Sequence, residues 1–204
     1  GAVQRKPPQG SCAPYKGFGY NTSEGAMRMP CVMRWPGHIP GGKVQDAVCA
    51  TMDLLPTFAA LAGAALSRHK IDGHDIRPVL FGETGTDSPW DRDGYCYYHM
   101  EQLQAVRAGQ WKLYLPLAAK LINLAHKTAP AKLELYDVRN DVGELHEVSA
   151  EHPDVVARLT AMAERTRSKI GDLDLPGKEQ RPAGFVENPK PLLPDSPAEK
   201  APAK

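Results

Sequence analysis

The pattern of apolar and polar positions divides the chain into a helical part and a later part made of short strands. Residues 31–35 are mostly apolar and follow a glycine-rich loop, which predicts a strand covered on both faces. Thr51 as an N-cap and Asp53 in the first turn predict the start of a helix. Its apolar stripe has three- and four-residue spacing and consists of Leu54, Leu55, Phe58, Leu61 and Ala64. A short helix is predicted over 78–82.

Strands dominate beyond a polar linker at 83–91, which is rich in Gly, Thr, Ser, Pro and Asp and marks the best domain boundary. The strand predictions are 95–99, 103–107, 111–115 and 133–136, and their short turns favour one antiparallel sheet. Pro153 opens a helix where its missing amide costs least, and the apolar stripe continues to Ile170. We expect this helix to lie on the sheet.

Residues 172–204 lose this periodicity and are rich in proline, lysine and glutamate. Such a composition cannot bury enough apolar surface to offset the entropy of ordering. It predicts an extended segment that becomes disordered from about Asp195.

Charge and length exclude several classes of protein. The chain has 204 residues, enough to bury a core, and its 25 basic and 24 acidic residues are interspersed to a net charge of +1. That balance gives no electrostatic footprint for nucleic acid. No apolar run reaches the ~18 residues of a membrane span. The sequence does not begin with the pattern of a signal peptide. Because Gly1 is expected to be an internal residue, this observation does not decide the cellular compartment.

Four cysteines, Cys12, Cys31, Cys49 and Cys96, show no metal-ligand or Cys-x-x-Cys spacing. We expect buried free thiols rather than a disulfide or a metal site, because free Cys packs as a small hydrophobe.

The glycine-rich stretch 13–30 contains Gly17, Gly19 and the pair Glu24-Gly25, and it ends at Pro30. It resembles, without a gap, the late catalytic loop of the arylsulfatase A-like family in the alkaline phosphatase superfamily. That loop usually reads Pro-Leu-Arg-Gly-Gly-Lys-Gly-Thr-Thr-Trp-Glu-Gly-Gly-Ile-Arg-Val-Pro. Further matches follow in the same order: Arg34-Trp35-Pro36-Gly37, Thr51-Met52-Asp53-Leu54, Ile71-Asp72-Gly73, Arg107-Ala108-Gly109, Leu135-Tyr136-Asp137 and Gln180-Arg181-Pro182. The chain resembles the C-terminal part of a sulfatase.

This resemblance implies an α/β fold with three regions. Residues 1–85 would be the remnant of the catalytic domain, 92–172 a small four-stranded antiparallel sheet with a packed helix, and 173–204 an extended proline-rich tail. It also implies hydrolysis of sulfate esters, either small molecules or sulfated glycans, in a periplasmic, extracellular or lysosomal compartment.

In the family the nucleophile is a formylglycine made within a Cys/Ser-x-Pro-x-Arg motif, and calcium is held by carboxylates and an Asn. Neither the full motif nor that ligand set is found here, so both are expected in the intact parent only. Cys12-Ala13-Pro14-Tyr15-Lys16 resembles the motif with Lys in place of Arg, but the late-loop match already accounts for these residues. The fragment alone is therefore expected to be catalytically silent.

Candidate site residues follow from the same alignment. The family lysine that contacts the sulfate falls at Gly19, which leaves Lys16 as the nearest cation. Lys16 is therefore the catalytic candidate, and a solvated surface charge is the alternative. His99 ends an aromatic strand and is a candidate substrate contact, with a surface histidine as its alternative.

Structural roles are favoured for three further charges. Glu24 is expected to hydrogen-bond backbone amides of its loop, and Arg28 and Arg34 to anchor that loop to neighbouring strands. His38 and His74 have no partner at metal-ligand spacing. We expect neither to bind a metal.

Two other functions stay open. The loss of the lysine at Gly19 favours a non-catalytic relative that binds sulfated glycans or another partner. A phosphoester hydrolase on the same scaffold is disfavoured by the sulfatase-like later matches.

Overall fold

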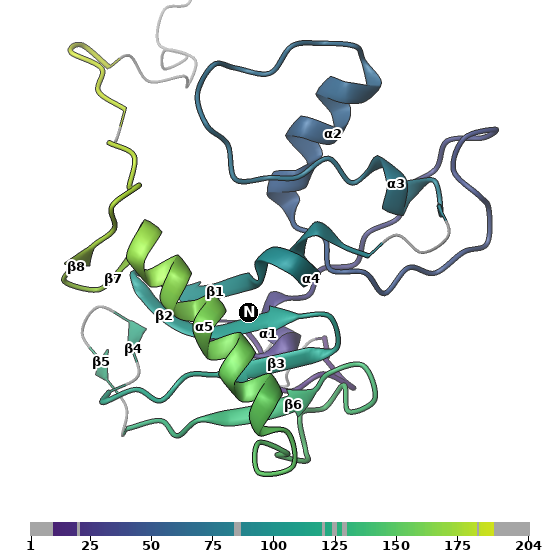
Figure 1. Ribbon diagram of the computed structural model, residues 1–204. Helices are drawn as coiled ribbons and strands as arrows, with labels where there is room; N and C mark the ends of the chain where they lie inside the picture. The colour runs from purple at the N-terminus through teal and green to yellow at the C-terminus, as the bar shows by residue number, and fades with distance from the viewer. Residues whose placement is uncertain are drawn as a thin grey trace, which may run out of the picture.

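The computed structural model describes residues 10–19, 21–83, 87–119, 121–123, 126–127, 130–182 and 184–189. Figure 1 shows a sheet with one long helix on it, and a second region of loops and short helices beside it. The helices are α1 (Glu24–Met27), α2 (Leu54–Leu61) with a preceding 3-10 turn η2 (Thr51–Asp53), α3 (Arg77–Leu80), α4 (Pro89–Asp93) and α5 (Pro153–Ile170). The strands are β1 (Tyr95–His99), β2 (Gln102–Ala108), β3 (Trp111–Tyr114), β4 (Leu121–Asn123), β5 (His126–Lys127), β6 (Glu134–Asp137), β7 (Gly171–Asp172) and β8 (Leu175–Pro176).

The four predicted strands form one antiparallel sheet in the order β1-β2-β3-β6. Their bounds agree with the sequence prediction to within one or two residues, so this part of the predicted fold is confirmed. The hairpin turn at Gly109 has a φ of 60°, a backbone conformation that glycine adopts without a steric penalty. In the antiparallel pairing of β2 with β3, Arg107 lies opposite Lys112.

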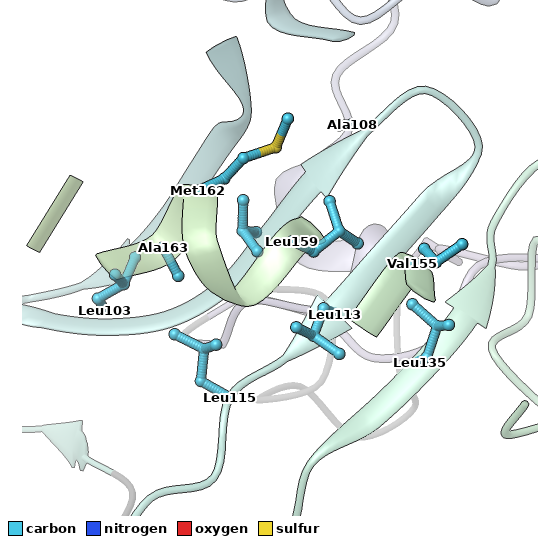
Figure 2. Packing of buried hydrophobic residues seen from close by; sticks show 10 residues of the cluster. Leu103, Ala108, Leu113, Leu115, Leu135, Val155, Leu159, Met162 and Ala163 are labelled. Carbon is cyan, nitrogen blue, oxygen red and sulfur yellow. The ribbon is translucent and has the colours of Figure 1, made fainter. Parts of the chain in front are cut away.

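One face of the sheet packs against α5, as predicted. The shared core is Leu103, Val106, Ala108, Leu113, Leu115 and Leu135 from the sheet region with Val155, Leu159, Met162 and Ala163 from the helix. Figure 2 shows these side chains of the helix and of the strands gathered where α5 crosses the sheet. The predicted stripe is therefore confirmed for Val155, Leu159, Met162 and Ala163, whereas Ile170 at its end is exposed.

The opposite face of the sheet is also covered. All seven residues of β2 are buried, which requires material on both faces. A second buried cluster lies there, and it consists of three tyrosines with two aliphatic residues: Tyr97, Tyr114, Tyr136, Ala105 and Val138. The segment 22–24 is buried against this second face.

The predicted helix at 51–64 is present as η2 followed by α2 and ends at Leu61. The Asp53 carboxylate accepts hydrogen bonds from the Ala50 N–H at 2.6 Å and from the Trp90 indole N–H at 2.9 Å. These bonds fix the start of the helix and tie it to α4. The apolar stripe, however, does not lie in a core: Leu55 is 60 % and Phe58 53 % exposed, whereas Thr57 is buried.

The prediction of a covered strand at 31–35 is wrong for this structure. Within the part of the chain that is described, residues 31–35 belong to no strand, and Val32 is 94 % exposed. No described helix or strand packs over these residues as a second layer, so their apolar side chains have no core in which to be buried. The expectation of buried cysteines fails for the same reason at Cys31 and Cys49, which are exposed, although all four thiols are free as predicted.

The linker 83–91 is shorter than predicted because α4 begins within it. Ser88 caps this helix by accepting a hydrogen bond from the Trp90 N–H, and the Asp91 carboxylate accepts one from the Ser88 N–H.

After α5, the chain continues directly into the short strands β7 and β8. The disorder predicted from Asp195 lies outside the described residues, and the division into regions at 85 and 172 stays a prediction. Among the described helices, none is both long and apolar enough to cross a membrane.

Candidate functional site

The glycine-rich loop folds back on itself before it reaches the sheet. The Gly25 N–H donates to the Lys16 carbonyl oxygen at 2.8 Å, which closes the segment 16–25. A Cβ at Gly25 would lie 2.7 Å from the carbonyl oxygens of Lys16 and Gly17, so only glycine fits there. Gly19 differs, because nothing lies within 4 Å of the position its Cβ would take.

Glu24 is the centre of a buried cluster of charges on the second face of the sheet. Its carboxylate accepts hydrogen bonds from Arg28 Nε at 2.6 Å, Arg107 Nη1 at 3.0 Å and Lys112 Nζ at 2.8 Å. The Tyr97 hydroxyl donates to the same carboxylate at 3.3 Å. Glu24 was expected to bind backbone amides of its own loop, but its partners are side chains, three of them from the sheet. We call these residues the Glu24 cluster.

Glu144 supplies a second buried carboxylate to the cluster from the loop after β6. It accepts a hydrogen bond from the Tyr114 hydroxyl at 2.6 Å and lies 3.2 Å from Lys112 Nζ. The Glu24 N–H also donates to it, at 3.4 Å. Lys112 is therefore held between two carboxylates, and its Nζ donates in addition to the Thr22 carbonyl oxygen at 2.7 Å.

The cluster controls the ionisation of its members. Burial by itself would raise the pKa of Glu24, but Lys112, Arg107 and Arg28 outweigh it and lower that pKa to about 2. Burial lowers the pKa of Lys112, and both carboxylates oppose this shift. Burial and the nearby carboxylates raise the pKa values of Tyr97 and Tyr114, so both hydroxyls stay neutral donors.

The Glu24 cluster has the chemistry of an anchor rather than of a general acid or base. A carboxylate held ionised by three cations has no proton to give and little affinity for one near neutral pH. Arg28 anchors the loop as predicted, since its Nη2 also donates to the Val138 carbonyl oxygen at 3.4 Å. Arg34, the other predicted anchor, is exposed and lies on a separate apolar groove.

Lys16 lies at the edge of a cavity of about 500 Å³ between the loop and the sheet. Its Nζ is 3.5 Å from the Glu144 carbonyl oxygen and 5.1 Å from the centre of the Tyr136 ring. The lining combines the polar residues Asn21, Ser23, Gln104, Tyr114, Lys132 and Glu134 with the apolar residues Leu115, Leu117, Pro130 and Ala131. His99, the other predicted site residue, pairs with Gln102 at the end of β1 and is not among the described residues that line this cavity.

No group of three His, Cys, Asp or Glu side chains that would suit a metal ion occurs among the described residues. His74 illustrates why. Its ring packs edge-on against Trp90 with ring centres 4.5 Å apart, and its Nε2 lies 3.5 Å from the Asp93 carboxylate, while its backbone N–H donates to the Asp53 carboxylate at 2.8 Å. The calcium implied by the sulfatase resemblance was expected in the intact parent only, with its ligands outside this chain.

Sequence reasoning missed Arg107, Lys112 and Glu144. Arg107 and Lys112 did carry a signal, because a charged residue within an apolar strand, paired with another across a hairpin, must find a partner when both faces are covered. Glu144 carried none, because it stands in a loop and reaches the cluster only through the fold.

Comparison with known proteins identifies the class to which this fold and loop belong. The chain is 40 % identical to canine N-acetylgalactosamine-6-sulfatase over 106 residues, which cover 52 % of this chain and 19 % of that protein. It is similar to the solved structure of Ps i-CgsB in complex with k-i-k-neocarrahexaose, with 27 % identity, a TM-score of 0.60 and coverage of 75 % of this chain and 32 % of that one. A Bacteroides thetaiotaomicron structure, BT33336S-sulf, gives 28 % identity, a TM-score of 0.61 and coverage of 76 % and 32 %. The class is that of the sulfatases.

The family follows from a more specific match. The model of the family described as N-sulphoglucosamine sulphohydrolase, C-terminal, matches residues 16–169. The chain belongs to this family of sulfatase C-terminal regions, which confirms the predicted resemblance. It spans less than a third of the length of the relatives named above.

Proposed function

We propose that this chain is the C-terminal part of a sulfuric ester hydrolase, and that its loop 12–28 forms one wall of the pocket for the sulfate ester. The observation that carries the proposal is the Glu24 cluster. It fixes the loop to the sheet with buried charges, and so holds Lys16 at the cavity between the loop and the sheet. A loop that must orient a charge gains from such anchoring because catalysis depends on preorganised electrostatics.

Lys16 is the proposed contact for the sulfate group. Hydrolysis of a sulfate ester builds negative charge on the sulfuryl oxygens and on the leaving alkoxide, and a fixed ammonium stabilises that charge. The carbonyl of Glu144 and the ring of Tyr136 are the groups that orient the Lys16 side chain. The formylglycine nucleophile and calcium of the family belong to the intact parent in this proposal. The described residues contain no group of three His, Cys, Asp or Glu side chains that could hold a metal ion.

A sulfated glycan is the proposed substrate class. The cavity presents amide and hydroxyl groups, from Asn21, Ser23 and Gln104, which suit the hydroxyl groups of a sugar. Support comes from the structural neighbours: one is a complex with k-i-k-neocarrahexaose, and the other is described with the metabolism of multiple glycosaminoglycans. His99 is included as a proposed contact for a more distant part of the glycan, because it lies outside the cavity lining.

Binding of a sulfated oligosaccharide to residues 1–204 tests this proposal by calorimetry, without requiring turnover. Replacing Lys16 by Ala removes one charge-assisted contact and should weaken binding by about tenfold or more. Lys178→Ala is the matched control, since Lys178 is an exposed lysine that does not line the cavity. Equal affinity of the Lys16→Ala variant and the wild type would exclude Lys16 as the sulfate contact.

A second function, a non-catalytic relative that binds sulfated glycans, is favoured by one observation. Gly19 stands where the family has its sulfate-contacting lysine, and glycine offers no charge. The two proposals separate in the intact parent: an enzyme releases sulfate from the bound glycan, whereas a binding protein retains the glycan unchanged. The measurement is released sulfate by ion chromatography beside retained ligand by calorimetry.

A further inference from the structure

We propose that Lys132 is a second anion contact in the cavity that Lys16 lines, and that the site selects a glycan with a second anionic group besides its sulfate ester. This inference rests on the proposed function, because it specifies the substrate class of the same site. The second group is a sulfate or a carboxylate, since an ammonium donates charge-assisted hydrogen bonds to either.

Two separate parts of the chain each contribute one lysine to the cavity. The glycine-rich loop contributes Lys16, together with Gly17, Asn21 and Ser23. The rest of the lining comes from β2, β3 and the segment that leads into β6, and Lys132 belongs to that segment. The cavity volume of about 500 Å³ lies within the range of about 300–1,000 Å³ that is typical of ligand sites. One ligand in this cavity can therefore contact a lysine of the loop and a lysine of the sheet region.

Main-chain pairing fixes the backbone on both sides of Lys132. Before it, Ala131 and Leu117 exchange two backbone hydrogen bonds of 2.9 Å, which bring together the two ends of the excursion between β3 and β6. After it, β6 begins at Glu134, which lies opposite Tyr114 of β3. A side chain held by paired backbone is positioned more precisely than one on a loop. The exposed side chain of Lys132 therefore starts from a fixed point beside the cavity.

Lys132 is the less compensated of the two lysines. Lys16 Nζ donates to the Glu144 carbonyl oxygen at 3.5 Å and lies 5.1 Å from the centre of the Tyr136 ring. The Tyr136 hydroxyl donates to the Glu134 carboxylate at 3.2 Å, so this negative charge lies near the ring that Lys16 contacts. Lys132 has no hydrogen bond or ion pair with any residue that the structure describes. Its ammonium is therefore available to an anionic group of a ligand.

Apolar side chains complete the lining that the sheet region contributes. They are Leu115, Leu117, Pro130 and Ala131. The C–H groups of a sugar ring pack on apolar side chains, while its hydroxyl and acidic groups contact the polar ones. Glu134 repels an anion and suits a ligand hydroxyl, so Lys132 is the group beside it that an anion would contact. The lining therefore matches a sugar unit with a sulfate ester at Lys16 and a second acidic group at Lys132.

Calorimetry of residues 1–204 with matched pairs of tetrasaccharides tests the inference. The two tetrasaccharides of a pair share their sugar chain and one sulfate, and one of them carries a second anionic group. In the first pair that group is a sulfate, and in the second pair it is a carboxylate, which is reduced to the alcohol in the other tetrasaccharide. We expect the wild type to bind the doubly charged tetrasaccharide of at least one pair about tenfold more tightly, as for one charge-assisted contact.

Variants of Lys132 show whether this residue causes the preference. Lys132→Ala should lose the preference and should bind the singly charged tetrasaccharide like the wild type, whereas Lys132→Arg keeps the charge and should retain the preference. Lys16→Ala should weaken the binding of both tetrasaccharides of a pair by the same factor. Lys178→Ala, at an exposed lysine that does not line the cavity, is the control and should change neither affinity. The pair in which Lys132→Ala loses the preference identifies the group that Lys132 contacts.

The outcomes separate this inference from the proposed function. The inference is overturned if the wild type shows no preference in either pair, or if Lys132→Ala keeps the preference of the wild type; Lys132 is then a solvated surface charge. In that case the proposed function still stands wherever Lys16→Ala weakens binding. A preference that depends on Lys132 while Lys16→Ala binds like the wild type would remove Lys16 from the site and would retain the second contact. If no tetrasaccharide binds, both proposals are wrong for residues 1–204.

Discussion

The carboxylate of Glu24 lies 2.8 Å from the Nζ of Lys112, a residue 88 positions later in the chain. Both side chains are fully buried. The pair connects the glycine-rich loop to the middle of the sheet, and Arg107 and Glu144 extend it on either side. A buried ion pair adds little stability over apolar packing, but the loss of one partner leaves an uncompensated charge. The loop is therefore tied to the sheet by an ion pair in which the removal of either charge should destabilise the protein.

Glu24→Gln should destabilise the protein strongly. The change keeps the shape of the side chain but removes the charge that compensates Lys112 and Arg107, at a cost of about 3–5 kcal/mol. Urea unfolding followed by circular dichroism measures this difference. Glu151→Gln, at an exposed glutamate, should change the free energy of unfolding by less than about 0.5 kcal/mol. A Glu24→Gln variant as stable as the wild type would show that the cluster does not form.

Acid should unfold the wild type through the same residue. The pKa of Glu24 is lowered from 4.5 to about 2, so the folded protein binds this proton less readily than the unfolded chain does. The contribution to stability is complete above pH 4.5 and is lost as the pH falls toward 2, by about 3 kcal/mol in total. Unfolding free energies measured from pH 6 to pH 2 should fall more steeply for the wild type than for Glu24→Gln. Parallel curves would contradict the assignment.

Two glycines of the loop should respond in opposite ways to alanine. Gly25→Ala places a Cβ 2.7 Å from two carbonyl oxygens, so the backbone must move, at a cost of about 1–3 kcal/mol. Gly19→Ala meets no atom within 4 Å and should be neutral or slightly stabilising. Thermal unfolding of the two variants compares them directly. Equal losses would mean that the loop does not close as described.

Gly19→Lys should be tolerated and should strengthen binding of a sulfated oligosaccharide. The position is open, and the sulfatase resemblance aligns it with the family lysine that contacts the sulfate. An added charge-assisted contact corresponds to about a tenfold gain in affinity. Gly41→Lys is the matched control, because Gly41 is also open but lies outside the loop 12–28 that contributes Lys16, Gly17, Asn21 and Ser23 to the cavity lining. Equal gains in both variants would show a general charge effect rather than a site.

Residues 1–204 alone should release no sulfate above background from a sulfated glycan. The described residues hold no ligand set for a metal, and the full nucleophile motif of the family is not found in the sequence. The measurement is ion chromatography of sulfate after long incubation at high protein concentration. Sulfate release that tracks the purified chain would refute the expectation and would point to a nucleophile within this sequence.

The sequence by itself determined the sheet and its helix. Alternating and turn residues between Tyr95 and Asp137 specify the strands, and the stripe from Pro153 specifies α5, because local spacing alone decides which side chains share a face. The motif around Glu24 likewise identified the sulfatase family without any coordinates. These features depend on neighbours within a few residues of one another.

Only the tertiary structure decided what Glu24 contacts and which apolar residues stay uncovered. Lys112 and Glu144 reach Glu24 across long sequence separations, which no local pattern encodes. The strand predicted at 31–35 and the outward side of α2 depend on whether another layer is present to cover them. Apolar spacing determines which face of an element should be buried, and the arrangement of the rest of the molecule decides whether it is, because burial requires a second surface.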